Sequence, residues 1–158
     1  MKKGTIGILG TLVGAVAAAS ITKSKTNKTV TQKNEKVDKF KGYYNMLNQW
    51  LCLKQEGKNL NEYFDNNGYK TVAIYGMGEM GNRLYDELKD TDIEVKFAID
   101  KNAASTYSEL TVFELEDELP TADVMVVTAT FAFDEIEDEL SDKVDMPIVS
   151  LDDVVYEI

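Results

Sequence analysis

The sequence has no histidine and only one cysteine in its 158 residues. Without histidine, the chain lacks the commonest metal ligand, the Ser-His and Cys-His nucleophile pairs, and the usual general base near neutral pH. Cys52 has no partner in the chain for a disulfide, and its apolar context, QWLCLK, favours a buried, inert thiol over a reactive one. We therefore expect no metal site.

Basic residues are scarce after the first 41 positions. Residues 1–41 hold nine Lys against two acidic residues, a balance of +7, whereas residues 42–158 hold eight Lys or Arg against 26 acidic residues, a balance of −18. Nucleic-acid-binding proteins present basic surfaces, so we expect no nucleic acid as a partner of the acidic part. The basic part lies beside an apolar segment, which favours a membrane as its partner.

The apolar segment at the N-terminus runs from Ile6 to Ile21 and contains no charged residue. It is short for a membrane-spanning helix, and a secretory signal is the alternative interpretation. Seven lysines lie between residues 23 and 41, and positive charge after such a segment favours the cytoplasmic side. We expect a membrane-anchor helix over 1–22, a basic flexible tether over 23–35, and a cytoplasmic globular part.

Residues 36–68 have the pattern of a helical extension. The spacing predicts that one apolar and aromatic stripe packs in a core or a subunit interface; it comprises Phe40, Tyr43, Tyr44, Leu47, Trp50 and Leu51. Gly57 interrupts this pattern, and Asn59 is the expected N-cap of a second, short helix that ends at Asn67-Gly68.

Residues 69–158 alternate between strand and helix patterns. We expect strands at 71–75, 95–99, 111–113, 123–128 and 147–150, and helices at 79–89, 114–119, 132–140 and 151–157. Apolar strands between helices predict a parallel sheet that is covered on both faces. Right-handed crossovers then predict an α/β, doubly wound, Rossmann-like sheet of about five strands in the order 3-2-1-4-5.

The stretch YGMGEMG follows the first of these strands and has the spacing GxGxxG. Gly76 would permit the tight turn, Gly78 would let a pyrophosphate approach the backbone, and Gly81 would let the helix pack on the strand. Glu79 and Met80 open that helix, whose N-terminus offers free N–H groups to phosphates. The alternative is that the glycines serve packing alone.

An acidic residue closes the second expected strand. Asp100 lies 24 residues after Gly76, and its carboxylate is placed to accept hydrogen bonds from a ribose diol, which favours NAD. Lys101 is the alternative partner, for the 2′-phosphate of NADP. The predicted cofactor is therefore NAD(P) or a nucleotide-sugar.

The stretch VAIYGMGEMGNRLYDELKDTDIEVKFAIDKN resembles the N-terminal Rossmann domains of bacterial polysaccharide-biosynthesis proteins, namely nucleotide-sugar dehydratases and sugar acyltransferases. The later stretch LPTADVMVVTAT is similar to the same domains, so the resemblance covers roughly residues 69–158. It implies that Gly76, Gly78, Gly81 and Asp100 bind the ligand, and Thr128 ends the fourth strand at the same crevice. The outline ending in IDK is also similar to potassium-channel regulatory domains.

Three functions remain open at this point. The first is a membrane-tethered nucleotide-binding protein of cell-surface polysaccharide biosynthesis, with a homodimer or a larger enzyme as its partner. The second is a non-enzymatic sensor that acts on a membrane partner, and the third is a structural domain that assembles through the helices over 40–64. We assign no catalytic residue, because the YxxxK pair of Tyr85 and Lys89 falls on the helix that directly follows the glycine loop.

Overall fold

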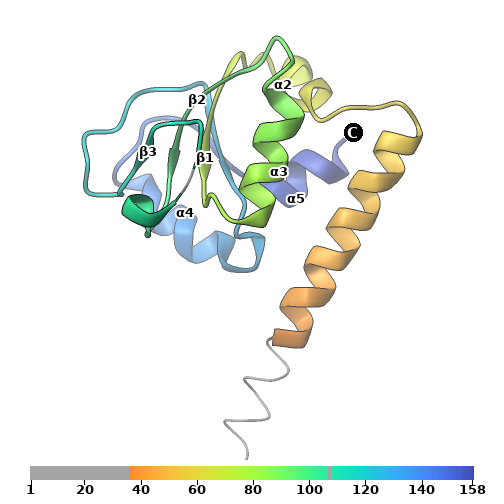
Figure 1. The fold of residues 1–158 in the computed structure, drawn as a ribbon, viewed down its shortest axis with the longest axis horizontal. Helices are drawn as coiled ribbons and strands as arrows, with labels where there is room; N and C mark the ends of the chain where they lie inside the picture. Colours follow the sequence, from red (N-terminus) through yellow and green to blue (C-terminus); the bar gives the residue numbers. More distant parts are fainter. Residues whose placement is uncertain (1–35, 107) are drawn as a thin grey trace, which may run out of the picture. The chain divides into compact units, whose positions relative to one another are not determined.

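The computed structural model describes residues 36–106 and 108–158 (Figure 1). The chain divides into two compact units, Met1–Tyr43 and Tyr44–Ile158. Among the described residues, no helix is long and apolar enough to cross a membrane. The anchor expected at Ile6–Ile21 and the tether over 23–35 lie outside the described residues.

Residues 36–55 are helical, and the part of this helix in the second unit contributes to the core. Met46, Trp50 and Leu53 are buried there, so the predicted burial of Trp50 is confirmed. Tyr44, Leu47 and Leu51 are exposed, so the core of this unit does not take up the whole expected stripe, and its alternative role in a subunit interface stays a prediction. A helix that is apolar on two faces buries only one of them in this unit.

The short helix α2 (Asn61–Asn67) follows, and Gly68 ends it in the left-handed conformation, as Asn67-Gly68 predicts. The expected capping role of Asn59 is wrong, because the N-cap is Leu60 and no side chain caps the helix. The Asn59 side chain instead accepts a hydrogen bond from Lys54, while its backbone N–H donates to Glu62 over 3.1 Å.

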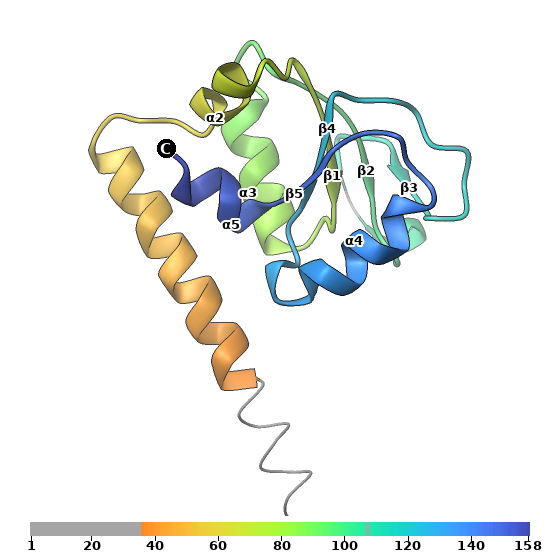
Figure 2. The ribbon, with the colours of Figure 1, turned by 180° about the vertical axis from the view of Figure 1, so that it is seen from behind.

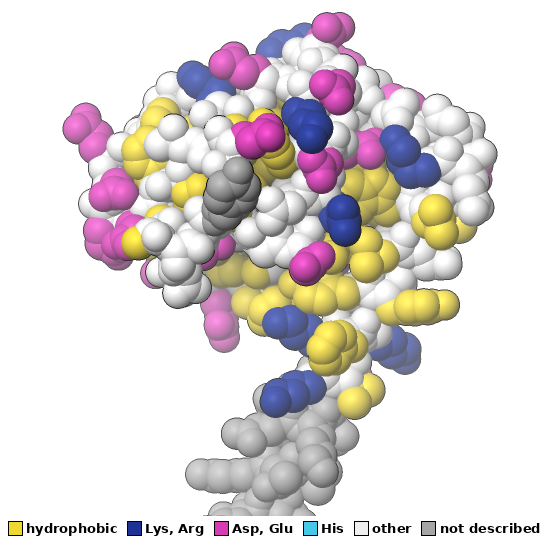
Figure 3. Space-filling model, viewed as in Figure 1, with side chains coloured by type: hydrophobic (Ala, Val, Ile, Leu, Met, Phe, Trp, Pro, Cys, Tyr) yellow, Lys and Arg dark blue, Asp and Glu magenta, His cyan; other side chains and the backbone are white. Residues whose placement is uncertain are grey.

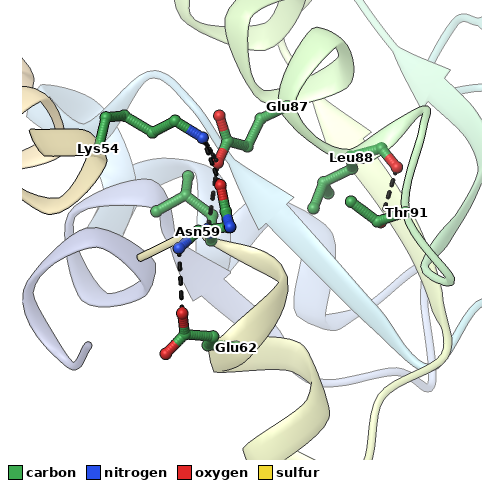
Figure 4. A network of polar contacts seen from close by, with 7 residues as sticks. Lys54, Asn59, Glu62, Glu87, Leu88 and Thr91 are labelled. Carbon is green, nitrogen blue, oxygen red and sulfur yellow. Dashed lines mark hydrogen bonds and ion pairs between the residues drawn. The ribbon is translucent and has the colours of Figure 1, made fainter. Parts of the chain in front are cut away.

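A polar network joins this region to the rest of the second unit (Figure 4). Lys54 Nζ lies 2.8 Å from Glu87 Oε1, and the N–H of Leu60 donates to the same oxygen over 3.3 Å. Glu87 is on the helix α3 (Glu79–Leu88), whose first turn begins at the glycine loop. The network thus connects the helix over 36–55 to the helix that carries the candidate site.

The described residues form a sheet of five parallel strands in the order β3-β2-β1-β4-β5. The strands are β1 (Thr71–Tyr75), β2 (Glu94–Ile99), β3 (Val112–Phe113), β4 (Val124–Val127) and β5 (Ile148–Ser150). Buried β-branched residues dominate the central strands, as expected for a sheet that is covered on both faces. The α/β class, the parallel sheet and its predicted strand order are confirmed.

Helices lie on both faces of the sheet (Figures 1 and 2). On one face, Ile136 and Leu140 of α4 (Phe133–Ser141) pack against Ala73, Tyr75 and Met125 of the central strands. The other face is covered by α3 and by α5 (Leu151–Tyr156), whose buried leucines and valines complete the core. Ser150 begins α5 with a capping box that includes Asp153.

The helix expected at 114–119 is wrong, since these residues form a turn between β3 and β4. Asp117 makes this turn, because its carboxylate accepts the N–H of Glu114 over 2.8 Å. Glu114 and Glu118 would lie one helical turn apart and repel each other, and Pro120 prevents the helix from continuing. Six residues are also too few to sustain a helix without packing.

Candidate ligand site at the glycine loop

The glycine loop joins β1 to α3 at the carboxyl edge of the sheet. Gly76 has φ 93°, a left-handed conformation that favours glycine, and a Cβ there would lie 2.9 Å from Thr128 Oγ1. Its N–H donates to Ile99 O over 2.8 Å, and its carbonyl accepts from Thr128 Oγ1 over 2.7 Å. Gly76 is therefore required by the backbone of the turn itself.

Gly81 lies in a crowded position, whereas Gly78 lies in an open one. A Cβ on Gly81 would lie 2.1 Å from the carbonyl oxygen of Gly76, so the helix approaches the loop as closely as the GxGxxG spacing predicts. A Cβ on Gly78 would meet nothing within 4 Å, and its φ of −75° suits any residue. Packing and backbone strain explain Gly76 and Gly81, but neither explains Gly78.

Three side chains hold the loop in place from different elements. Asp100, directly after β2, accepts the N–H of Met77 at Oδ2 and the N–H of Asn102 at Oδ1, each over 2.8 Å. The Asn82 amide on α3 donates to the carbonyls of Met77 and Gly78 over 3.0 and 2.9 Å. Together with the Thr128 hydroxyl, these contacts fix the loop before any ligand arrives.

Asn82 is a residue of the candidate site that the sequence analysis missed, since its amide bonds to the Met77 and Gly78 carbonyls. The signal available in the sequence is an amide side chain one residue after the last glycine, at a position where it can turn back to the loop carbonyls. Its place in the site comes from its hydrogen bonds and not from the glycine spacing.

The first turn of α3 has backbone N–H groups that no described residue accepts. Gly78 is the N-cap, and no side chain among residues 36–106 and 108–158 caps the helix. Among the described residues, no acceptor is found for the N–H groups of Glu79, Met80 and Gly81. Unpaired N–H groups and the positive end of the helix dipole attract an anion, and the exposed Gly78 leaves room for one to approach.

Lys101 lies beside Asp100 but is engaged elsewhere. Its Nζ is 3.5 Å from Glu139 Oε2 on α4, and the Tyr75 phenol and Glu139 raise the pKa of this lysine. The Tyr75 hydroxyl is buried and has no hydrogen-bond partner within the part of the chain that the structure describes, and burial raises its pKa. The ion pair is exposed and therefore weak, so a phosphate can compete with Glu139 for Lys101.

Asp152 is a second carboxylate at the carboxyl edge, which the sequence analysis did not select. It lies on α5, directly after β5, and partial burial raises its pKa, although a hydrogen bond with Thr130 acts in the opposite direction. Within the described residues, no group of three or more metal-ligating side chains is found.

The YxxxK pair lies at the C-terminal end of α3, with Tyr85 in the helix and Lys89 as its C-cap. The Tyr85 hydroxyl donates to Glu109 over 3.2 Å, and Lys89 Nζ lies 2.7 Å from Asp86. Burial and Glu109 raise the pKa of Tyr85, which opposes its use as a base at neutral pH.

No protein-family model, no curated protein and no solved structure matches the chain. The functional argument therefore depends on the geometry of the loop.

Proposed function

We propose that this protein binds a nucleotide, NAD(P) or a nucleotide-sugar, with the pyrophosphate at the start of α3. The observation that carries the proposal is the combination of a fixed loop, free N–H groups at Glu79, Met80 and Gly81, and open space beside Gly78. A ligand phosphate would accept hydrogen bonds from donors that this chain leaves without an acceptor among its described residues.

The sheet supports the same proposal. Ligands of open parallel sheets bind beyond the carboxyl ends of the strands, where the strand order reverses. In the order β3-β2-β1-β4-β5 the reversal falls between β1 and β4, and Gly76 and Thr128 follow these two strands. We accordingly interpret the fold as Rossmann-like.

The role proposed for Asp100 differs from the ribose contact expected from the sequence alone. Each of its oxygens already accepts one backbone N–H, so its first task is to hold the loop. A carboxylate oxygen has a second lone pair, which leaves it able to accept a ribose hydroxyl as well. Asp100 would thus couple the loop conformation to the ribose of the ligand.

The wider setting of the proposal is cell-surface polysaccharide biosynthesis on the cytoplasmic side of a membrane. The resemblance of residues 69–158 to domains of that class supports the setting, as do the apolar segment at Ile6–Ile21 and the lysines that follow it. A larger enzyme of the same process would then use the bound nucleotide.

The sensor is the second candidate, and the bonding at the loop favours it over catalysis. Asp100 is bonded to two backbone N–H groups and Lys101 is paired with Glu139, so neither is placed to exchange a proton with a ligand. A sensor would bind NADH without oxidising it. An NADH absorbance assay with candidate sugar acceptors separates this case from an oxidoreductase.

The proposal is tested by calorimetry on the purified full chain, with NAD, NADP and UDP-glucose as ligands. Wild type should bind at least one of them below millimolar concentration, and Gly78→Val should abolish that binding because the side chain fills the open space. Gly42→Val is the matched control, since a Cβ at this glycine of the helix over 36–55 also meets nothing within 4 Å. If wild type binds none of the three ligands, the proposal fails.

A further inference from the structure

Asp152 is a carboxylate at the carboxyl edge of the sheet that the proposed pyrophosphate site does not use. Acidic side chains lie over much of the surface in the view of Figure 3, as the balance of −18 over residues 42–158 requires. Asp152 differs from such surface residues because it is partly buried, at the start of α5. The capping of α5 does not need its carboxylate, since Ser150 and Asp153 form the capping box.

The hydrogen-bonding capacity of the Asp152 carboxylate is not filled by the described residues. Among them, the Thr130 hydroxyl is the donor found for it, whereas an ionised carboxylate has about four acceptor sites. Taking such a group partly out of water without enough donors is costly, and burial accordingly raises its pKa. The side chain is therefore suited to donors that come from outside the chain, and the hydroxyl groups of a ligand are donors of this kind.

The strand register brings Thr130 and Asp152 to the same edge as the glycine loop. Four strand ends form one row across β2, β1, β4 and β5, namely Ile99, Tyr75, Val127 and Ser150. Asp100 and the glycine loop follow the first two of these ends, while Thr130 and Asp152 lie two or three residues beyond the last two. Neighbouring strands are about 5 Å apart, so β5 lies about 10 Å from β1. Asp100 and Asp152 therefore follow strands on opposite sides of β1 and its glycine loop.

We propose that Thr130 and Asp152 bind the second sugar of a nucleoside diphosphate ligand, with the Asp152 carboxylate accepting hydrogen bonds from the sugar hydroxyls. This inference rests on the proposed function and assigns the parts of the ligand. In NAD(P) and in nucleotide-sugars alike, the pyrophosphate has a sugar on each side. With the pyrophosphate at the start of α3, the nucleoside ribose lies towards Asp100, and the second sugar lies towards the ends of β4 and β5. The Thr130 oxygen keeps its own acceptor sites and can bind a further hydroxyl.

The charge of this part of the chain favours a neutral sugar over a second anionic group. Residues 124–158 supply β4, β5 and the segments after them, and they contain ten acidic residues and one basic residue, Lys143. The Lys143 ammonium lies beside the Leu115 carbonyl, at 3.4 Å, and the Glu116 carboxylate, at 3.5 Å. A second phosphate at Asp152 would meet like charge, whereas a hydroxyl group donates to a carboxylate directly.

Calorimetry on the full chain with matched pairs of ligands tests this assignment. UDP-glucose differs from UDP by the second sugar, and ADP-ribose differs from ADP in the same way, so the two pairs cover a hexose and a pentose. Wild type should bind the sugar-bearing member of at least one pair about tenfold more tightly, the factor that one hydrogen bond to a charged group supplies. Asp152→Ala should remove this difference and leave the binding of UDP and ADP unchanged.

Asp134→Ala is the matched control, because it removes an exposed carboxylate from the first turn of α4 and should change neither member of a pair. The same loss in Asp134→Ala would show a long-range effect of charge, and an equal loss for UDP and UDP-glucose in Asp152→Ala would show a role in the diphosphate site or the fold; either result overturns the assignment. Wild type that binds both members of each pair equally overturns it and leaves the pyrophosphate site standing. Wild type that binds none of the four ligands refutes the proposed function as well.

Discussion

Gly81→Ala should destabilise the second unit far more than its single added methyl group suggests. The new Cβ would lie 2.1 Å from the carbonyl oxygen of Gly76, well inside ordinary contact distance. That oxygen is fixed by the Thr128 hydroxyl at 2.7 Å, and the N–H of Gly76 is fixed by Ile99. Either α3 or the loop must therefore shift by about 1 Å, an overpacking that costs ~2 kcal/mol or more.

This loss is measured by urea and thermal unfolding of the full chain, followed by the fluorescence of Trp50, the only tryptophan. About 4 °C per kcal/mol applies to a unit of this size, so the midpoint should fall by about 8 °C. Gly78→Ser is the control, because a Cβ at Gly78 has open space and serine is a good N-cap. The free energy of unfolding of this variant should differ from that of wild type by only about 0.3 kcal/mol. Equal stability of Gly81→Ala and wild type would refute the close contact between α3 and the loop.

Three further predictions concern the core, the loop and high pH. Trp50→Ala should cost ~3–5 kcal/mol, and the native emission maximum should be blue-shifted from that of free tryptophan; emission like the free amino acid would contradict its burial. Asp100→Ala leaves the N–H of Met77 without its acceptor, which should cost ~1–3 kcal/mol in urea unfolding and weaken the binding of NAD and of inorganic pyrophosphate alike; weaker NAD binding with unchanged pyrophosphate binding would indicate a ribose contact without a loop role. Burial, followed by the Glu157 carboxylate, raises the pKa of Tyr63 to about 12, from 10.0 for a free tyrosine. The contribution of Tyr63 to the free energy of unfolding should therefore be fully present below pH 10. It should be lost as the pH rises towards 12, by up to about 3 kcal/mol, because the unfolded chain ionises first. Tyr63→Phe should lose less stability over that interval, and an equal loss in both proteins would contradict the assignment.

The sheet was predictable because its signals are local and repeated. Buried strands are short apolar runs, and the connection lengths permit only a few strand orders. The 114–119 segment shows where this reasoning fails, since its acidic residues suit a helix face in composition while the Asp117 carboxylate stabilises a turn instead. Propensity does not reveal which side chain will bond to the backbone.

The backbone of the glycine loop was predictable, but the hydrogen bonds that hold it were not. The glycine spacing located the tight turn at Gly76. It also located the open space beside Gly78 and the close approach of α3 to the loop at Gly81. The partners of Asp100 and Asn82 are backbone groups of the loop, and their identity depends on how β2 and α3 lie beside it. The division of the helical stripe into a buried and an exposed face depends likewise on tertiary packing, because both faces have helical spacing.

The central claim is that the free N–H groups at the start of α3 hold a nucleotide pyrophosphate. Amide proton–nitrogen NMR spectra of the ¹⁵N-labelled full chain, recorded during a titration with NAD, UDP-glucose or inorganic pyrophosphate, observe these groups directly. The account predicts saturable shifts that are largest for Gly78, Glu79, Met80 and Gly81, and that are absent in Gly78→Val. Shifts confined to other parts of the chain, or no shifts with any of the three ligands at millimolar concentration, would contradict it.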